Sequence, residues 1–219
     1  MSAGLLDTIR QHLFTAVIGD VMDAAGLAHQ FLPPYLRPLD DSHLLVGRAL
    51  TVLESDIADR DPEDEPFGLM FKALDDLKPG EVYVCTGSTG AFALWGELMS
   101  SRAARLGATG AVVDGFHRDT RGIRRLGFPV FSAGAYAQDQ RPRGRVTDFR
   151  VPLTFSNGAV VRPGDVIVGD VDGVLAIPAD HVGDIVAAAL AKAGAERDVE
   201  RAIAAGEATT AIFARTGIM

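Results

Sequence analysis

The chain has 219 residues, of which 47% are hydrophobic and 23% are charged, and its formal net charge is −8. This composition is close to the average for globular domains, and it excludes a disordered or low-complexity chain. The acidic balance argues against a nucleic-acid partner, because attraction to phosphate requires a basic surface, and the single cysteine, Cys85, excludes a disulfide framework and a cysteine-rich metal site.

Two helices are predicted at the N-terminus, over residues 5–26. Apolar residues recur at helical spacing in two stripes, 5–13 and 17–25, and Thr15 is the expected N-cap of the second helix. The segment has no basic stretch followed by an apolar core, so it does not resemble a signal peptide. No apolar run in the chain approaches the roughly 18 residues of a membrane span. We therefore expect a cytoplasmic protein without a membrane partner.

The next segments predict an irregular crossing, a strand and an acidic loop. Residues 31–41 contain three prolines, which favour irregular structure, and residues 44–53 are rich in Leu and Val, which favours a strand. Five of the ten residues from 57 to 66 (IADRDPEDEP) are Asp or Glu, which is typical of a solvent-exposed loop.

From residue 68 onward the pattern is typical of an α/β fold. Buried-type strands alternate with helices and short loops, and this order predicts parallel strands joined by crossover helices. The expected elements are a helix over 69–77, a strand over 81–86, a loop over 86–90, a helix over 97–106 and strands over 110–113 and 129–132.

The second half predicts short antiparallel strands followed by a helical arm. Turn sequences separate four short apolar segments, so we expect an antiparallel β layer formed by strands over 146–153, 159–161, 165–169 and 174–177. Asp180 is the expected cap of a long alanine-rich helix over 181–205, which Gly206 ends. The chain is predicted to be one domain (residues 1–219), with an α/β core over 44–178 and a C-terminal arm over 180–215.

The segment from residue 87 to residue 124 carries the strongest signs of a binding site. Residues 96–98 open a predicted helix, whose first turn presents unpaired N–H groups to an anion. Residues 114–119 follow a buried strand, and functional groups in α/β sheets gather beyond the carboxyl ends of the strands. There Arg118 can hold a carboxylate through two parallel hydrogen bonds, and Asp119 offers oxygen ligands to a divalent cation.

Other catalytic patterns are not supported. The tripeptide 117–119 (HRD) matches the catalytic loop of protein kinases, but Arg124 stands where that loop has Asn. The chain has no P-loop, no GxGxxG fingerprint and no GxSxG elbow. We expect His117 to be a loop histidine with satisfied hydrogen bonds, and Cys85 to be an inert buried thiol.

Taken together, these motifs resemble those of the RraA-like family, over about residues 14–215. The family includes regulators of ribonuclease E activity and 4-hydroxy-4-methyl-2-oxoglutarate/4-carboxy-4-hydroxy-2-oxoadipate aldolases. The resemblance rests on LWGEL at 94–98, DG at 114–115, RD at 118–119, LGFPVF at 126–131, PGDV at 163–166 and DVDGV at 170–174.

The resemblance implies an α/β/β/α swivelling-domain sandwich of the RraA-like type with a C-terminal helical arm, assembled as a homotrimer or a dimer of trimers. It also implies a Mg²⁺- or Mn²⁺-dependent pyruvate aldolase site at the subunit interface. The substrate would be a 4-hydroxy-2-oxo acid such as 4-hydroxy-4-methyl-2-oxoglutarate, cleaved to pyruvate and a second 2-oxo acid. Oxaloacetate decarboxylation would be a side activity.

The resemblance also assigns roles to individual residues. Asp119 would ligate the metal, and Arg118 would hold the oxygens of the pyruvyl group. The N–H groups of Leu98 and Met99, next to Gly96, would receive the carboxylate. Glu97 would orient a water molecule for proton transfer. Finally, a glutamate from a neighbouring C-terminal helix would reach the site, and both Glu196 and Glu200 are candidates.

Three alternatives to this assignment differ in how well the sequence supports them. A lysine Schiff base would be another way to stabilise an enolate, but Lys72, Lys78 and Lys192 all lie outside the motif segment. A methyltransferase lacks support because the chain has no glycine-rich nucleoside loop with an acidic partner. A non-catalytic regulator that binds and inhibits a ribonuclease complex stays open, although Glu97, Arg118 and Asp119 together favour the enzyme. The sequence leaves the identity of the hydroxy-oxo acid open.

Overall fold

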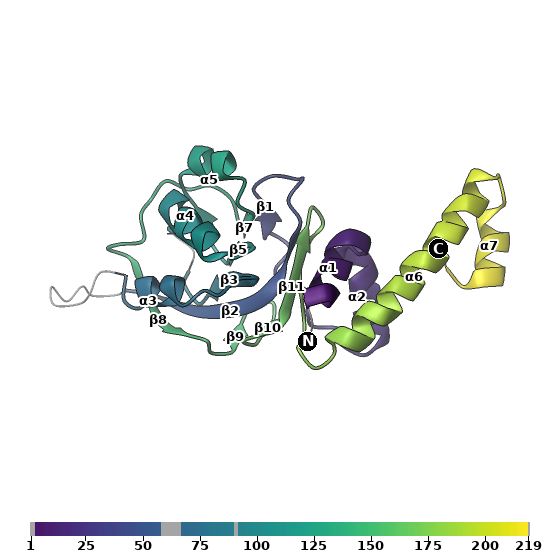
Figure 1. Cartoon of the computed structure of the whole chain (residues 1–219), viewed down its shortest axis with the longest axis horizontal. Coiled ribbons are helices and arrows are strands. Elements are labelled where there is room, and N and C mark those ends of the chain that lie inside the picture. The colour runs from purple at the N-terminus through teal and green to yellow at the C-terminus, as the bar shows by residue number, and fades with distance from the viewer. Residues whose placement is uncertain (1–2, 58–66, 90–91, 219) are drawn as a thin grey trace.

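One mixed sheet organises the computed structural model, which describes residues 3–57, 67–89 and 92–218 (Figure 1). Seven of its strands follow the order β1-β7-β5-β3-β2-β11-β12, and β8 also pairs with β2. These strands are β1 (Arg37–Pro38), β2 (Leu45–Asp56), β3 (Glu81–Thr86), β5 (Gly110–Val113), β7 (Val130–Ser132), β8 (Gly144–Phe149), β11 (Val166–Asp170) and β12 (Gly173–Ile177).

The parallel half of the sheet matches the sequence prediction. β2, β3, β5 and β7 are parallel to one another, and their aliphatic residues are almost all buried. Strands that are buried on both faces are expected to be continuous apolar runs, as EVYVCT and GAVV are. Their carboxyl ends therefore share one edge of the sheet.

The strands of the second half are antiparallel, as predicted, but most of them do not form a separate layer. β11 pairs with the first part of β2 and β8 with the last part, because β2 is 12 residues long and carries both partners. Only β9 (Leu153–Thr154) and β10 (Val160–Val161) form a small sheet of their own. The strand predicted over 146–153 is broken at Arg150, whose φ of 57° lies in the left-handed region.

Two groups of helices cover the body and form the arm (Figure 1). The helices α3 (Met70–Asp75), α4 (Glu97–Leu106) and α5 (Thr120–Leu126) pack on one side, over a core that includes Tyr83 and Trp95. On the other side, α1 (Ala3–His12) and α2 (Thr15–Ala24) pack against the long helix α6 (Val182–Ala204), which leads to α7 (Thr209–Thr216). In Figure 1, α6 extends away from the sheet.

Both predicted N-caps are wrong by one residue, whereas Gly206 follows the C-cap of α6, as predicted. Thr15 is the first helical residue of α2 rather than its N-cap, and Phe14 holds the cap position. The Thr15 hydroxyl and N–H instead donate to the carboxylate of Asp170, at 2.7 and 2.8 Å. The N-cap of α6 is His181, one residue after Asp180, and no side chain caps that helix.

Several short elements were not predicted, among them β1 and α5. A further pair, β4 (Ala93–Trp95) and β6 (Phe116–His117), forms a small parallel sheet that carries the site described below. Such short segments contain too few residues to show a periodic pattern. Most of the predicted acidic loop, residues 58–66, lies outside the described residues. None of the helices that the structure describes combines the length and the apolar character of a membrane span.

Candidate active site

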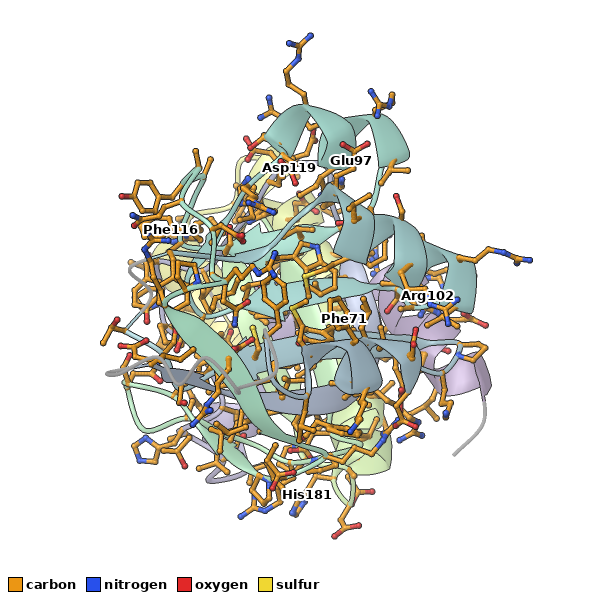
Figure 2. The ribbon with its side chains drawn as sticks, turned by 90° about the vertical axis from the view of Figure 1, so that its left-hand side faces the viewer. Phe71, Glu97, Arg102, Phe116, Asp119 and His181 are labelled. Carbon is orange, nitrogen blue, oxygen red and sulfur yellow. The ribbon has the colours of Figure 1, made fainter. Side chains whose placement is uncertain are left out.

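The candidate site lies where the parallel pair β4 and β6 leads into two helices. β4 is followed by α4 and β6 by α5, and the N–H of Arg118 donates to the carbonyl oxygen of Trp95 at 2.9 Å. The two helices therefore begin side by side. Figure 2 shows Asp119 and Glu97, each from one of these helix starts, next to each other. The structure thus brings together residues that are 22 positions apart in the sequence.

Asp119 presents its carboxylate to the first turn of α4. The Oδ2 atom accepts a hydrogen bond from the N–H of Glu97 at 3.3 Å, and 45% of the side chain is exposed. Asp119 itself has a φ of 59°, in the left-handed region, where Asp and Asn are the most tolerated residues other than Gly. Its carboxylate is therefore fixed on one oxygen and open to solvent.

Gly96 makes this close approach possible. A Cβ atom at position 96 would stand 2.8 Å from Oδ2 of Asp119, closer than real Cβ atoms come to an oxygen. Gly96 is the N-cap of α4, and its extended backbone would suit any residue, so space is the only reason for a glycine there. Gly96, which the sequence predicts to be a substrate-binding residue, thus borders the Asp119 carboxylate.

Arg118 lies between two carboxylates. Its Nη1 atom is 3.3 Å from Oδ1 of Asp139, and its Nε atom is 3.8 Å from Oδ2 of Asp119. Asp139 was missed by sequence reasoning, because it comes from an irregular segment that no motif marks. The segment is held at the site by β4, since the N–H of Ala93 donates to the carbonyl oxygen of Gln138 at 2.8 Å.

Glu97 points toward α5. Its Oε1 atom accepts a hydrogen bond from Nη2 of Arg125 at 2.6 Å, and its carboxylate occupies the space that a Cβ at Gly122 would fill. The side chain of Glu97 is about one-third exposed. Arg125 and Gly122 therefore hold Glu97 in one orientation beside Asp119, and neither was identified from the sequence.

A cleft of about 220 Å³ opens in front of these groups. Leu98 and Met99 line it from the first turn of α4, where amide N–H groups have no acceptor within the helix. Leu98 is 84% exposed, although it is a large apolar residue. Arg118 and Asp119 also line a second hollow of about 260 Å³ on their other side, next to Thr120 and Tyr136.

His117 has a structural role, as predicted. Its Nδ1 atom lies 2.7 Å from the hydroxyl of Ser132, and its Nε2 atom lies 3.0 Å from the hydroxyl of Thr120. Burial, together with the nearby charge of Arg124, lowers the pKa of His117 below its usual value. The imidazole is therefore buried, hydrogen-bonded and neutral near pH 7. Cys85 is also buried, and burial raises the pKa of its thiol, which makes it unreactive.

A buried glutamate forms a hydrogen bond with one of the residues that line the cleft. Glu54 is 2% exposed, and its Oε2 atom accepts a hydrogen bond from Nε2 of Gln140, a cleft residue, at 2.6 Å. Burial raises the pKa of Glu54 to about 8, and the contact with Gln140 opposes this only in part. Glu54 was not identified from the sequence, because it lies just beyond the strand predicted over 44–53.

The donor set fits a hard divalent cation with few protein ligands. Within the described residues, no three His, Cys, Asp or Glu side chains gather as a ligand cluster. Magnesium commonly binds through one or two carboxylates and keeps several water molecules. The open oxygen of Asp119 beside the cleft suits this mode of binding. The distant candidates Glu196 and Glu200 lie on α6, which Figure 1 places far from α5 within one chain, and Glu196 pairs with Lys192 at 2.9 Å.

The sequence is similar to those of known proteins. A family model described as RraA-like, Aldolase/RraA, matches residues 15–176. A protein from Halalkalibacterium halodurans, named as a candidate 4-hydroxy-4-methyl-2-oxoglutarate aldolase, is 33% identical over 93% of this chain and 91% of its own length. Protein DlpA from Legionella pneumophila is 30% identical over 88% of this chain, but the match spans only 30% of the length of DlpA.

Solved structures are similar as well. An uncharacterized protein from Pseudomonas syringae pv. tomato matches 97% of this chain and 93% of its own, with a TM-score of 0.84 and 27% identity. The RNA-processing inhibitor RraA from Thermus thermophilis matches 73% of this chain and 90% of its own, with a TM-score of 0.56 and 26% identity. These matches confirm the predicted fold class, a mixed α/β fold of the RraA-like type.

Proposed function

Because the chain belongs to the RraA-like family, we propose that it is a divalent-metal-dependent aldolase that cleaves a 4-hydroxy-2-oxo acid into pyruvate and a second carbonyl compound. The observation that carries this proposal is the placement of Arg118 and Asp119 against the first turn of α4, in one cleft. The guanidinium of Arg118 and free N–H groups can bind the oxygens of a small 2-oxo acid, and the carboxylate of Asp119 can bind its metal ion. The similarity to a candidate aldolase from H. halodurans supports the same reaction.

The proposed reaction is a retro-aldol cleavage. The 4-hydroxyl group loses its proton to a water molecule oriented by Glu97, and the bond between C3 and C4 breaks. The electron pair of that bond passes to C3 and is shared with the 2-oxo oxygen. C3 then takes up a proton, so the substrate becomes pyruvate and a second carbonyl compound without another reactant.

Asp119 would hold Mg²⁺ or Mn²⁺ through its exposed carboxylate. The bound ion would supply Lewis-acid chemistry, which stabilises the negative charge that develops on the 2-oxo oxygen. The first turn of α4 would add a further electrostatic effect, because N–H groups at a helix N-terminus also favour negative charge. A lysine Schiff base is not needed for this chemistry, and no lysine lines the cleft among the described residues.

Arg118 and the N–H groups of Leu98 and Met99 would bind the substrate. Arg118 presents a planar guanidinium that can hold two oxygens of the pyruvyl group at once. Asp139 stabilises that guanidinium from the other side, at 3.3 Å, which limits the orientations that Arg118 can adopt. Glu97, held by Arg125, would keep its water molecule beside the reacting carbons.

We also propose that the protein is a homotrimer or a dimer of trimers in which α6 completes a neighbouring site. The far end of the arm carries a hollow of about 530 Å³ lined by Glu196, Glu200 and apolar residues that include Phe14 and Ile203. Phe14 and Ile203 are both exposed in the single chain. An exposed apolar surface next to carboxylates is suited to contact with a second copy.

Oxaloacetate gives a direct test of the proposed activity. Loss of CO₂ from oxaloacetate forms the same pyruvate enolate, so the purified protein with added Mg²⁺ is expected to release pyruvate faster than the spontaneous rate. Chelation by EDTA is expected to remove this difference, and fresh Mg²⁺ to restore it. A rate equal to the spontaneous one, with oxaloacetate and with a panel of 4-hydroxy-2-oxo acids, would overturn the proposal.

The second candidate is a regulator that binds and inhibits a ribonuclease complex without catalysis. The similarity to the Thermus RNA-processing inhibitor favours it. It predicts that the protein slows a ribonuclease in a purified assay and that Asp119→Asn leaves this effect intact. The aldolase proposal predicts instead that Asp119→Asn abolishes pyruvate release, since Asp119 would hold the metal ion.

A further inference from the structure

A chain of contacts leads from the main sheet to Arg118. Near the end of β2, the Oε2 atom of Glu54 accepts a hydrogen bond from Nε2 of Gln140 at 2.6 Å. The residue before Gln140 is Asp139, whose Oδ1 atom lies 3.3 Å from Nη1 of Arg118. Glu54 and Gln140 are each 2% exposed within one chain, so contact with a second copy would only bury them further. The link between them is therefore a property of the single chain.

Asp139 lies in the irregular connection between β7 and β8. The structure describes this whole connection, and it contains no helix or strand of its own. On the cleft side, the N–H of Ala93 donates to the carbonyl oxygen of Gln138 at 2.8 Å. On the side of the main sheet, the side chain of Gln140 reaches Glu54. Because segments outside sheet ladders open more easily than strands do, these two contacts help to set the position of Asp139.

The strands on either side of Glu54 meet it with uncharged groups. The titratable groups near it on β3 are Tyr83 and Cys85, which are both buried, and burial raises the pKa of each well above its usual value. On β8, the residue opposite Glu54 is Val146, whereas Arg145 pairs with the next position along β2. Neither strand therefore places a cation directly opposite Glu54.

The irregular connection meets Glu54 with an amide rather than a cation. Its charged groups nearby are Asp139, next to Gln140, and Arg143, which donates to the carbonyl oxygen of Asp139 at 2.9 Å. Oε1 of Glu54 has no hydrogen-bond partner within the described part of the chain. A carboxylate buried in such surroundings costs far more free energy than a neutral carboxyl does, and burial raises the pKa of Glu54 to about 8. The neutral carboxyl is therefore the form that fits this contact.

Resting on the proposed function, in which Arg118 binds the substrate, we infer that Glu54 is a positioning residue that holds Arg118 in place through Gln140 and Asp139 while its own carboxyl is neutral. When Glu54 loses its proton, access of water to the new charge becomes favourable. β3 and β8 are fixed by the hydrogen bonds of the sheet, so the irregular connection is the part that moves aside. Asp139 moves with Gln140, and Arg118 loses the carboxylate that limits its orientation.

The size of the effect follows from the populations of the two forms of Glu54. If only the neutral form binds an anion at Arg118 with full affinity, the apparent affinity falls with the fraction of that form. With a pKa of about 8, nearly all of the protein carries a neutral Glu54 at pH 6.5, and about one-tenth of it does at pH 9. The dissociation constant of an anion at Arg118 is therefore expected to rise about tenfold between these two pH values.

Oxalate measures this effect without catalysis. It is a dianion with the shape of the pyruvate enolate, and its charge is constant over this pH range. Titration calorimetry with Mg²⁺ is expected to show the weakening in the wild type between pH 6.5 and pH 9. Glu54→Gln keeps an acceptor for Gln140 but cannot ionise, so its dissociation constant for oxalate should be nearly the same at both. An equal loss of affinity in the wild type and in Glu54→Gln would overturn the inference.

Two further variants separate positioning from a purely structural role. Glu54→Ala removes the acceptor for Gln140, and it is expected to bind oxalate about tenfold more weakly than the wild type already at pH 6.5, since a hydrogen bond to a charged group is worth roughly that factor. Asp56→Asn removes an exposed carboxyl from the same strand and should keep the pH response of the wild type. Circular dichroism at both pH values checks that each protein is folded. A folded Glu54→Ala with the affinity of the wild type would contradict the inference.

Oxaloacetate separates this inference from the proposed function. If the wild type releases pyruvate, but KM for oxaloacetate rises equally with pH in the wild type and in Glu54→Gln, the inference is wrong and the proposed function stands. If oxalate binds with the expected pH response, but no 2-oxo acid yields pyruvate, the anion site and its dependence on Glu54 stand and the proposed reaction is wrong. If the wild type neither binds oxalate nor releases pyruvate, both are wrong.

Discussion

Gly96 and Asp119 approach each other so closely that a Cβ atom on Gly96 would stand 2.8 Å from Oδ2 of Asp119. The contact joins the starts of α4 and α5, and it sets the position of the carboxylate that we propose as the metal ligand. Because the backbone of Gly96 is extended, a larger residue could adopt the same backbone angles. Its side chain would instead collide with the carboxylate of Asp119.

Gly96→Ala is therefore expected to impair the site without unfolding the protein. The added methyl group displaces the Asp119 carboxylate, and displacements of this size in a catalytic site reduce rates by about 10- to 100-fold. Measurement of kcat/KM with Mg²⁺, together with the urea midpoint, checks this expectation. Activity equal to that of the wild type would show that the position of Asp119 is not critical.

Arg118→Lys keeps the positive charge but is expected to lower kcat/KM by roughly 100-fold, because an ammonium group cannot reproduce a planar contact with two oxygens. Asp139→Asn tests the same contact from its other side. It removes the charge that opposes Arg118 at 3.3 Å, and a smaller loss is expected. A value for Arg118→Lys within a few-fold of the wild type would exclude Arg118 from substrate binding.

Glu54 predicts a pH dependence of stability. Burial raises its pKa from 4.5 in the unfolded chain to about 8 in the folded protein. Between these values the folded protein holds a proton that the unfolded chain has released, so the free energy of unfolding falls as pH rises from 4.5 to 8. The shift corresponds to roughly 5 kcal/mol over the whole window.

Glu54→Gln isolates this effect, because glutamine still accepts the hydrogen bond from Gln140 and cannot ionise. Urea unfolding at pH 5, 7 and 9 should show the variant gaining stability over the wild type as pH rises. Asp56→Asn, at an exposed carboxyl on the same strand, is expected to leave the pH dependence unchanged. If the wild type and Glu54→Gln respond equally to pH, Glu54 is not the buried acid that limits stability at high pH.

Elements with a long or distinctive sequence pattern could be predicted from the sequence, whereas short and irregular ones could not. The strands β3 and β5 are continuous apolar runs, and the start of α4 carries a recognisable motif, so these three elements were predicted with the observed bounds. α5 has only seven residues and begins at a left-handed Asp119, so it shows neither periodicity nor an ordinary cap. Asp139 reaches Arg118 through an irregular segment, and only three-dimensional structure could place it there.

The length of β2 explains the difference in the second half of the fold. The strand was predicted over 44–53, so the prediction left out its final residues, which include Glu54 and Asp56. In the structure, Glu54 is buried by Gln140 and the strand continues to pair with β8. The extra length places β8 and β11 in the same sheet, and that arrangement cannot be deduced from a local pattern.

Truncation after Gly194 tests the proposed role of the arm. Removal of residues 195–219 is expected to lower activity far more than it lowers the folded fraction, and to loosen the oligomer in light scattering. Glu196→Gln and Glu200→Gln, made separately, identify which carboxylate reaches the neighbouring site, since only that variant should lose activity as an intact oligomer. A fully active monomer would contradict both the trimer and the shared site.

The most direct measurement of the central claim is pyruvate release from a 4-hydroxy-2-oxo acid by the wild type and by Asp119→Asn, each with and without Mg²⁺. Asn tolerates the left-handed backbone at position 119 but provides no charge for the ion. The account predicts Mg²⁺-dependent release by the wild type, and no release by a folded Asp119→Asn protein at any Mg²⁺ concentration. Release by Asp119→Asn at the wild-type rate, or wild-type release that persists in EDTA, would contradict it.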